Sequence, residues 1–123
     1  MIKLYDLQRI THEHADEYKA AMARVIDSGW FLQGDETKQF EHDYARYIGT
    51  QHCVAVANGL DALYLILRAY KEMGVMADGD EIIVPANTYI ATILAITRNN
   101  LKPVLVEPTW HHLELDTDRV EQA

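Results

Sequence analysis

The sequence contains one cysteine, no long hydrophobic run and few cationic side chains. A single thiol, Cys53, can form neither an internal disulfide nor a multi-thiolate metal site, so we expect a reducing, cytoplasmic environment. Crossing a bilayer takes about 18 to 20 consecutive apolar residues, and no run approaches that length, so no membrane anchor is expected. With 11 lysines and arginines against 19 aspartates and glutamates, the net charge of -8 argues against binding to nucleic acid or anionic membranes.

The sequence does contain enough apolar residues for a core. Its 123 residues are 49% hydrophobic, which fits a globular chain, and no repeat, Pro-rich linker or Ser-rich linker divides it. The last residues, 115–123, look like the opening of a helix that Asp116 or Thr117 could cap, yet the sequence stops about two turns later. We therefore expect the chain to continue in a longer parent protein.

Two helices are expected before any strand. Apolar residues recur at helical spacing over residues 14–28, and Gly29 can adopt the left-handed conformation that ends many helices. A second helix over residues 35–48 is expected to begin with Asp35 as its N-cap and to end at another glycine. Together these helices would form an N-terminal helical arm, residues 1–50.

The remaining residues, 51–123, alternate predicted strands and helices. Short apolar runs predict three buried strands, at residues 53–57, 81–84 and 103–106. Helices are expected over residues 60–73 and from a cap at Asn87 or Thr88 to about Arg98. This alternation implies right-handed βαβ crossovers, and hence an α/β fold whose mostly parallel sheet is covered by helices on both faces.

Ligands of such sheets collect beyond the carboxyl ends of the strands, which here are residues 58–61, 86–89 and 107–110. In the first of these loops Gly59 lets the main chain approach a ligand closely, and the free N–H groups at the start of the following helix attract an anion. The loop therefore predicts a phosphate cup. The alternative is that Asn58 and Gly59 form only a tight strand-to-helix turn. Neither a Walker A loop nor a G-x-G-x-x-G turn is present.

Several segments carry a family resemblance in the same order and spacing. They are residues 29–34 (GWFLQG), 56–63 (VANGLDAL), 79–85 (GDEIIVP), 87–92 (NTYIAT) and 102–107 (KPVLVE). Together they resemble the DegT/DnrJ/EryC1/StrS family of sugar aminotransferases, which depend on pyridoxal 5'-phosphate (PLP). The resemblance implies that residues 51–123 are the N-terminal part of the large PLP-binding domain of the aspartate-aminotransferase-like fold (PLP fold type I).

The resemblance implies a cofactor-binding role for three residues. Gly59 and Leu60 match the turn whose backbone amides hold the PLP phosphate, although most relatives have Thr in place of Leu60, so that a hydroxyl contact is missing. Tyr89 matches the aromatic residue that stacks on the pyridine ring, and the alternative is a core tyrosine one turn into a helix. Trp30 and Phe31 match a segment near the substrate mouth and dimer interface, where a packing role explains them equally well.

The catalytic groups of the family have no counterpart in this sequence. PLP chemistry needs a lysine for the Schiff base and a carboxylate that keeps the pyridine nitrogen protonated, and the family position of the lysine falls beyond residue 123. No catalytic residue is therefore assigned. The lysines present are Lys3, Lys19, Lys38, Lys71 and Lys102. We expect them at termini, on solvated helix surfaces or at the start of a strand.

Other reactive side chains give weak signals. The neighbouring histidines are His12, His14, His111 and His112. They lack the number and spacing of ligands that zinc sites require, so no metal is expected. Cys53 is expected to be an inert residue of the buried strand at residues 53–57, because no cationic neighbour is evident to activate its thiol.

The resemblance implies that the parent protein is an aminotransferase. It would transfer an amino group, from glutamate, to C3 of a dTDP-linked keto-6-deoxyhexose in deoxyamino-sugar or surface-polysaccharide biosynthesis, and it would act as a homodimer. This chain alone would be inactive. Two other interpretations stay open: a non-catalytic α/β module that binds a phosphorylated small molecule, and a fragment that supplies oligomer contacts.

Overall fold

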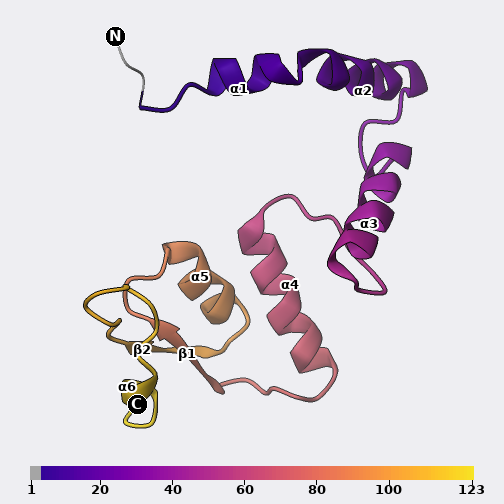
Figure 1. Ribbon diagram of the computed structural model, residues 1–123. Coiled ribbons are helices and arrows are strands. Elements are labelled where there is room, and N and C mark those ends of the chain that lie inside the picture. Colours follow the sequence, from indigo (N-terminus) through magenta and orange to yellow (C-terminus); the bar gives the residue numbers. More distant parts are fainter. Residues whose placement is uncertain (1–3) are drawn as a thin grey trace. The chain divides into compact units, whose positions relative to one another are not determined.

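The computed structural model describes residues 4–123, so Lys3 lies outside the described residues. The chain divides into two compact units, one that ends at Ala55 and one that spans Val56–Ala123 (Figure 1). No described helix has the length and apolar character needed to cross a membrane. Within residues 4–123, no group of three or more His, Cys, Asp or Glu side chains is placed to hold a metal ion.

The first unit consists of helices. They are α1 (Leu7–Glu13), α2 (Ala15–Ser28) and α3 (Asp35–Ile48). Gly29 and Gly49 end α2 and α3 in the left-handed conformation, with φ of 66° and 83°, which confirms the predicted helix ends. The predicted cap of α3 is wrong, because Gly34 is the N-cap. Asp35 lies in the first turn of the helix, where its negative charge interacts favourably with the positive end of the helix dipole.

Helix α1 is absent from the sequence-based prediction, which places the first helix at residues 14–28. Asp6 caps α1, because its carboxylate accepts a hydrogen bond from the Arg9 N–H at 3.2 Å. A non-helical residue, His14, separates α1 from α2. Helix α1 has seven residues, of which only Leu7 and Ile10 are aliphatic, so it is too short to show an apolar period.

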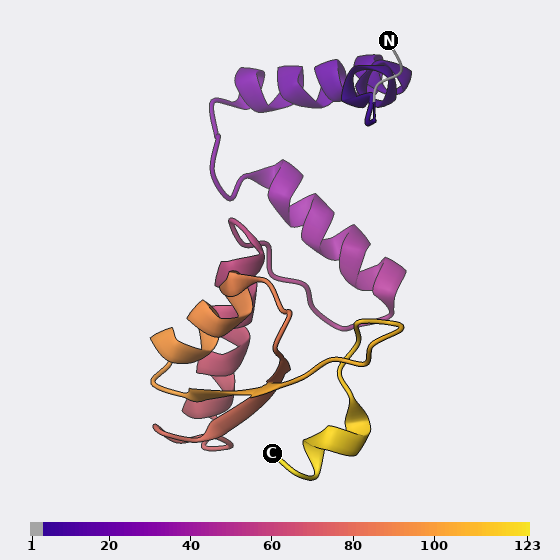
Figure 2. The ribbon, with the colours of Figure 1, turned by 90° about the vertical axis from the view of Figure 1, so that its left-hand side faces the viewer.

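The second unit alternates helices and strands, which confirms the predicted α/β class. Its elements are α4 (Gly59–Glu72), β1 (Glu81–Pro85), α5 (Ile90–Arg98), β2 (Lys102–Val106) and α6 (Thr117–Val120). Strands β1 and β2 pair in parallel, with Glu81 opposite Lys102 and Pro85 opposite Val106. Parallel strands require a crossover connection, and α5 supplies it while packing against both β2 and α4 (Figure 2).

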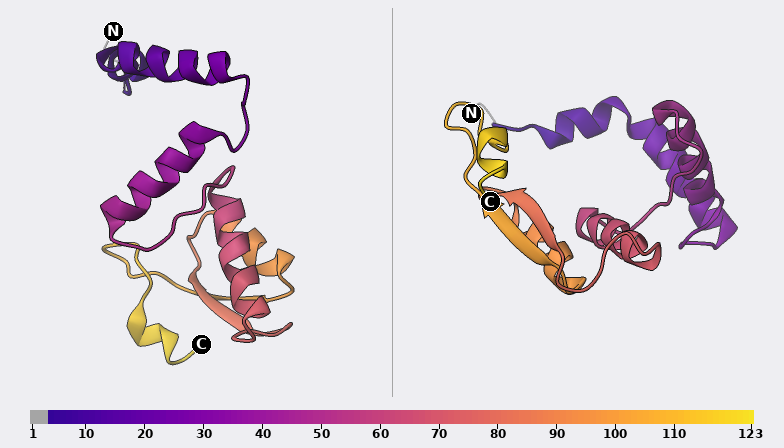
Figure 3. Two further views of the ribbon diagram at one scale, coloured as in Figure 1. Left: turned by 90° about the vertical axis from the view of Figure 1, so that its right-hand side faces the viewer. Right: turned by 90° about the horizontal axis from the view of Figure 1, so that it is seen from below.

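Helix α6 follows the loop that leaves β2 and lies close to the C-terminus (Figure 3). Its N-cap is Asp116, one of the two predicted caps, and the Asp116 carboxylate accepts a hydrogen bond from the Asp118 N–H at 3.1 Å. The other candidate, Thr117, is the first residue of the helix. The helix is short, so this cap satisfies one of the few main-chain donors that its opening turn exposes.

The predicted strand at residues 53–57 is wrong. The sheet formed by residues 4–123 contains β1 and β2 alone, so this segment has no strand partner there and belongs to no helix or strand. The Ala55 N–H donates instead to the carboxylate of Glu41 at 2.7 Å, and Val54 is 75% exposed. An apolar run becomes a buried strand only where a neighbouring strand is present to pair with it.

Helix α5 begins later than the sequence predicts. Its N-cap is Tyr89, in an extended conformation, rather than Asn87 or Thr88. The Thr88 N–H donates to the Pro85 carbonyl at 3.0 Å in a turn after β1, and the Asn87 side chain donates to the Leu113 carbonyl at 3.0 Å. The polar residues expected to cap the helix therefore stabilise the preceding turn and a neighbouring loop.

The apolar core of the second unit lies where α5 meets the strands. Its buried residues are Val84, Ile96 and Leu101, and the partly buried residues packed against them are Leu67, Met76 and Ile82. These residues come from α4, β1, α5 and the connections between them. The core therefore joins every element of this unit that precedes β2, and its apolar burial is the main term that stabilises their packing.

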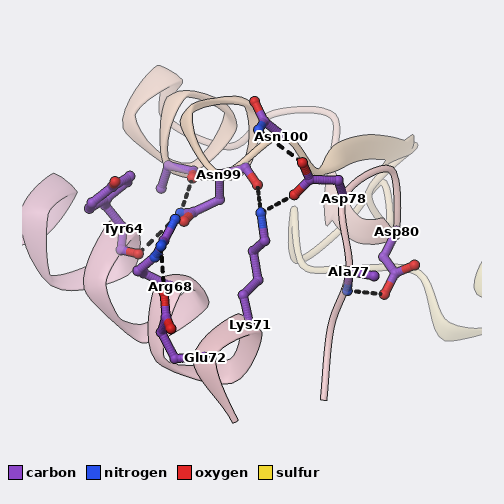
Figure 4. Close-up of polar contacts among 10 residues, drawn as sticks. Tyr64, Arg68, Lys71, Glu72, Ala77, Asp78, Asp80, Asn99 and Asn100 are labelled. Atoms are coloured by element: carbon purple, nitrogen blue, oxygen red, sulfur yellow. Dashed lines mark hydrogen bonds and ion pairs between the residues drawn. The ribbon is translucent and has the colours of Figure 1, made fainter. Parts of the chain in front are cut away.

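A polar cluster adjoins this core (Figure 4). The Lys71 Nζ donates to the main-chain carbonyl of Asn99 at 2.6 Å and also to the Asp78 carboxylate. Asn99 is 2% exposed, and its Nδ2 donates to the carbonyls of Tyr64 at 3.0 Å and Ala95 at 2.8 Å. The expectation that the lysines lie on solvated helix surfaces is wrong for Lys71, whose side chain is only 13% exposed.

This cluster makes stability depend on pH in acid. Hydrogen bonds from Lys71 and then from Asn100 hold the pKa of Asp78 below its ordinary value. Because the pKa of Asp78 is lower in the folded state, the stabilising contribution of its carboxylate is complete above the unfolded-state pKa of about 3.9. That contribution is lost as the pH falls through the lower folded-state pKa. The difference in free energy of unfolding between wild type and Asp78→Asn should therefore be constant above about pH 5 and shrink below about pH 4. Denaturant titrations across this range test it, and a difference unchanged in acid would contradict it.

The start of α4 gives a second prediction. Asn58 is its N-cap, and the Asn58 Oδ1 accepts a hydrogen bond from the Asp61 N–H at 3.0 Å. Asn58→Ala should lower the free energy of unfolding by about 1 kcal/mol, because it removes this acceptor, whereas Asn58→Ser keeps an oxygen there and should lose little. Chemical denaturation followed by circular dichroism measures both variants. Equal stability of the Ala variant and wild type would show that the cap contributes nothing.

Candidate functional site

The first turns of α4 and α5 line one cavity of about 740 Å³. Gly59 and Leu60 come from the start of α4, and Tyr89 comes from the cap of α5. The structure therefore brings together the three residues singled out in the sequence, which come from segments before and after β1 in the chain. The rest of the lining is mostly apolar and includes Leu63 and Ile90.

Two main-chain donors at the start of α4, in residues that line this cavity, have no hydrogen-bond partner among the described residues. The Asn58 carbonyl accepts from the Ala62 N–H at 3.1 Å, and its side chain accepts from the Asp61 N–H. No hydrogen bond within residues 4–123 uses the N–H groups of Gly59 and Leu60. Free N–H groups at the positive end of a helix of this length form a site that attracts an anion such as a phosphate group.

A negative charge also lies nearby, on Asp61 in the first turn of α4. Its carboxylate accepts a hydrogen bond from the Asn58 Nδ2 at 3.0 Å, and Asp61 is not among the residues that line the cavity. This contact keeps the carboxylate beside the cap residue. The carboxylate therefore stabilises the helix dipole without lining the space in front of the free N–H groups.

Gly59 leaves open space at the cavity. A Cβ atom built on Gly59 would meet no protein atom within 4 Å, and the residue does not adopt the left-handed conformation that penalises side chains. The protein itself therefore tolerates a larger residue at this position. A side chain at position 59 would therefore interfere only with a ligand that approaches the main chain closely.

Tyr89 presents its ring rather than burying it. The side chain is 79% exposed, and the residue precedes α5 instead of lying one turn inside it. The alternative interpretation, a core tyrosine within a helix, is therefore wrong. An exposed phenol ring that lines a largely apolar cavity offers a flat face on which a planar ligand can stack.

Sequence reasoning assigned no role to Thr92, which also lines the cavity. Its Oγ1 accepts a hydrogen bond from the Thr88 Oγ1 at 2.9 Å. Because a hydroxyl has one donor and two acceptor positions, Thr92 keeps its own proton available to a ligand. No sequence pattern indicated this role, because Thr88 precedes α5 and the pairing of the two hydroxyls depends on the turn between β1 and α5.

The third predicted loop lies outside the cavity lining. The Thr109 N–H donates to the Glu114 carbonyl at 2.8 Å, which closes a turn that carries the 89% exposed Trp110. This turn is connected to the cavity region by the hydrogen bond from Asn87 to Leu113. Of the three predicted loops, two therefore form the cavity and the third is attached to one of them.

None of the four described lysines lines this cavity. Lys19 and Lys38 pair with carboxylates on the surface, at 3.7 Å and 3.3 Å, and Lys38 lies over the ring of Trp30 at 5.4 Å. Lys71 belongs to the polar cluster with Asn99, and Lys102 begins β2. The cavity therefore offers binding groups without a lysine nucleophile among residues 4–123.

The first unit has a separate cavity of about 530 Å³ that includes Cys53. Lys38, His42 and Arg46 also line it. The expectation that Cys53 belongs to a buried strand without cationic neighbours is therefore wrong, since its side chain is partly exposed beside such residues. Trp30 and Phe31 lie in the connector between α2 and α3 and are 60% and 67% exposed.

Comparison with known proteins identifies the family. The profile of the DegT/DnrJ/EryC1/StrS aminotransferase family matches residues 12–123. A curated relative, dTDP-3-amino-3,6-dideoxy-alpha-D-galactopyranose transaminase of Aneurinibacillus thermoaerophilus, is 48% identical over 99% of this chain and 32% of its own length. The chain thus spans about a third of the length of the curated relatives it matches.

Solved structures of similar proteins confirm the predicted fold. DesV of Streptomyces venezuelae is 43% identical with a TM-score of 0.85, over 98% of this chain and 32% of that chain. The E. coli GDP-4-keto-6-deoxy-D-mannose-3-dehydratase, solved with bound hydrated PLP, is 28% identical with a TM-score of 0.77, over 99% of this chain and 30% of that chain. The resemblance in the sequence is confirmed, and this chain belongs to the DegT/DnrJ/EryC1/StrS aminotransferase family.

Proposed function

We propose that this chain is the N-terminal part of a PLP-dependent nucleotide-sugar aminotransferase and that its cavity binds the cofactor. The observation that supports this proposal is the cavity itself, which joins the free N–H groups of Gly59 and Leu60 to the exposed ring of Tyr89. A phosphorylated aromatic cofactor needs both features, an anion site and a stacking face, in one place.

The residues present fit the cofactor. The N–H groups of Gly59 and Leu60 would hold its phosphate, and Tyr89 would stack on its ring. Leu60 offers no hydroxyl, so the main-chain donors carry the phosphate contact, and Thr92 adds one hydroxyl to the cavity. When bound, PLP supplies an electron sink for the charge that develops as an amino group is transferred.

The role of this chain is to bind and orient. Apolar residues such as Leu63 and Ile90 line the cavity, and with a cofactor bound against them they would reduce the water around its phosphate and so strengthen the attraction of the α4 N–H groups for it. No residue of this chain is assigned a catalytic role. We propose that the lysine nucleophile and the carboxylate partner of the ring nitrogen lie in the remainder of a full-length protein.

The names of relatives support a substrate class. The Aneurinibacillus relative is named as a transaminase of a dTDP-linked 3-amino-3,6-dideoxy sugar, and a Streptomyces venezuelae relative, 44% identical, as one of a dTDP-linked 3-amino-3,4,6-trideoxy sugar. We propose that the full-length protein aminates C3 of a dTDP-linked keto-6-deoxyhexose with glutamate as donor. Its setting would be deoxyamino-sugar or surface-polysaccharide biosynthesis in the cytoplasm, and its assembly a homodimer.

The cofactor proposal is tested at Gly59. Full-length protein should bind PLP with a visible absorption band, and Gly59→Val should weaken binding at least about tenfold, or about 1.4 kcal/mol, because the added side chain occupies the space of the ligand. Leu60→Thr, which restores the hydroxyl of the family, should bind as tightly as wild type or more tightly. Tyr89→Phe should retain the stacking contact that Tyr89→Ala loses.

Controls separate binding from folding. The protein has open space around Gly59, so Gly59→Val should unfold at a temperature close to that of wild type when both are measured without PLP. Normal PLP binding by this variant, with wild-type stability, would show that the phosphate is held elsewhere.

The activity proposal is tested with glutamate and a dTDP-linked 3-keto-6-deoxyhexose. Full-length protein should produce the 3-amino sugar and 2-oxoglutarate, as followed by mass spectrometry, and residues 1–123 alone should produce neither. Glutamate should remove the visible band of the bound cofactor. A band that glutamate leaves unchanged would contradict an aminotransferase. Phosphate binding without any band would instead support a non-catalytic module.

A further inference from the structure

The polar cluster around Asn99 lies on the same two helices as the cavity, farther along each of them. Helix α4 supplies Lys71 and the carbonyl of Tyr64, and Asn99 is the C-cap of α5 (Figure 4). Tyr64 lies about one helical turn after Leu60, so the bond from Asn99 is made close to the cavity end of α4. The cluster therefore joins the two helices whose opening turns line the cavity.

The bonds made by Asn99 join α4 and α5 at main-chain atoms. Its Nδ2 donates to the Tyr64 carbonyl in α4 and to the Ala95 carbonyl in α5, at 3.0 Å and 2.8 Å. Its own carbonyl accepts from the Lys71 Nζ at 2.6 Å. One residue thus makes two separate hydrogen-bonded links between the helices, one through its side chain and one through its main chain.

These links specify a geometry that apolar packing alone leaves loose. Contacts between apolar side chains, such as Leu67 against the core around Ile96, are non-directional and tolerate small sliding movements. A hydrogen bond weakens steeply when its angle or distance changes. The Asn99 links therefore hold one spacing and one rotation of α4 against α5.

The buried side chain of Asn99 also carries an energetic cost. Its Oδ1 has no hydrogen-bond partner within residues 4–123, although the residue is 2% exposed. An apolar residue at this position would avoid that cost. A buried amide with one unsatisfied oxygen is more readily explained by the geometry that it enforces than by a gain in stability.

We infer that Asn99 is a positioning residue for the cofactor cavity, which sets the distance between the N–H groups of Gly59 and Leu60 and the ring of Tyr89. Lys71 supports it by holding the Asn99 carbonyl, and Asp78 holds the Lys71 ammonium in turn. This inference rests on the proposed function, since it concerns the fit of PLP between the two helix starts. It assigns no chemical step to Asn99.

The experiment compares PLP affinity with stability in the full-length protein. Asn99→Asp keeps the size of the side chain but turns a carboxylate oxygen toward the two carbonyls. The carboxylate and carbonyl oxygens repel each other, so the side-chain link between α4 and α5 is lost. Its PLP dissociation constant should rise at least about tenfold. Its visible circular dichroism at saturating PLP should also change, since that signal reports the orientation of the bound ring.

A second pair of variants covers the case in which Asn99→Asp fails to fold. Lys71→Met removes the donor to the Asn99 carbonyl and should also weaken PLP binding, whereas Lys71→Arg retains a donor and should restore most of the affinity. The matched control is Glu72→Gln, which changes the neighbouring Arg68–Glu72 ion pair on the exposed side of α4 and should leave both readouts at their wild-type values.

A purely structural role is distinguished with Val106→Ala. Val106 is 3% exposed in β2 and outside the Asn99 cluster, so this variant should lower stability without changing the affinity or the circular dichroism of bound PLP. The inference is overturned if the Asn99 and Lys71 variants bind PLP as wild type does, or if Val106→Ala loses as much affinity as they do. Failure of the wild-type protein to bind PLP would instead overturn the proposed function.

Discussion

The hydrogen bond from Asn99 to the carbonyl of Tyr64 joins two helices that the chain separates by a strand and its connections. Around it, α5 packs against both β2 and α4, and the apolar core fills the space between the helices and β1. The candidate site has no scaffold of its own, because every residue that lines it belongs to the first two turns of α4 and α5 or to the residues that cap them. The geometry of the site is therefore the geometry of this helix pair.

The attraction for an anion at the site comes from groups in direct contact with it rather than from the net charge of the chain. The chain carries a formal net charge of -8, which would repel a dianionic phosphate at long range. Within a few ångströms, however, the unpaired N–H groups of α4 dominate, since solvent and salt screen distant charges but not donors in direct contact. The contact between Asn58 and Asp61 serves the same end, because it holds the Asp61 carboxylate beside the cap, and Asp61 does not line the cavity.

Features set by the conformation of one residue or by the alternation of strands and helices were predictable from the sequence, and features that depend on particular partners were not. Gly29 and Gly49 end their helices as expected because the left-handed conformation is a property of glycine itself. The pairing of β1 with β2 follows from the alternation of strand and helix. The segment at residues 53–57 has the composition of a buried strand but lacks a neighbouring strand, so composition alone misplaced it. Lys71 looked solvated because its partners, Asp78 and Asn99, follow it at a distance in the chain. The cavity residues were found through their motifs, whereas Thr92 required the three-dimensional arrangement.

The two-stranded sheet has one further consequence. Strands β1 and β2 each have a single neighbour within residues 4–123, so each retains an outer edge of main-chain donors and acceptors. Such an edge can accept any extended segment that approaches it, including the same strand of another copy. A polypeptide that leaves both edges bare is exposed to edge-to-edge aggregation, so a segment that lies along them would also protect the sheet.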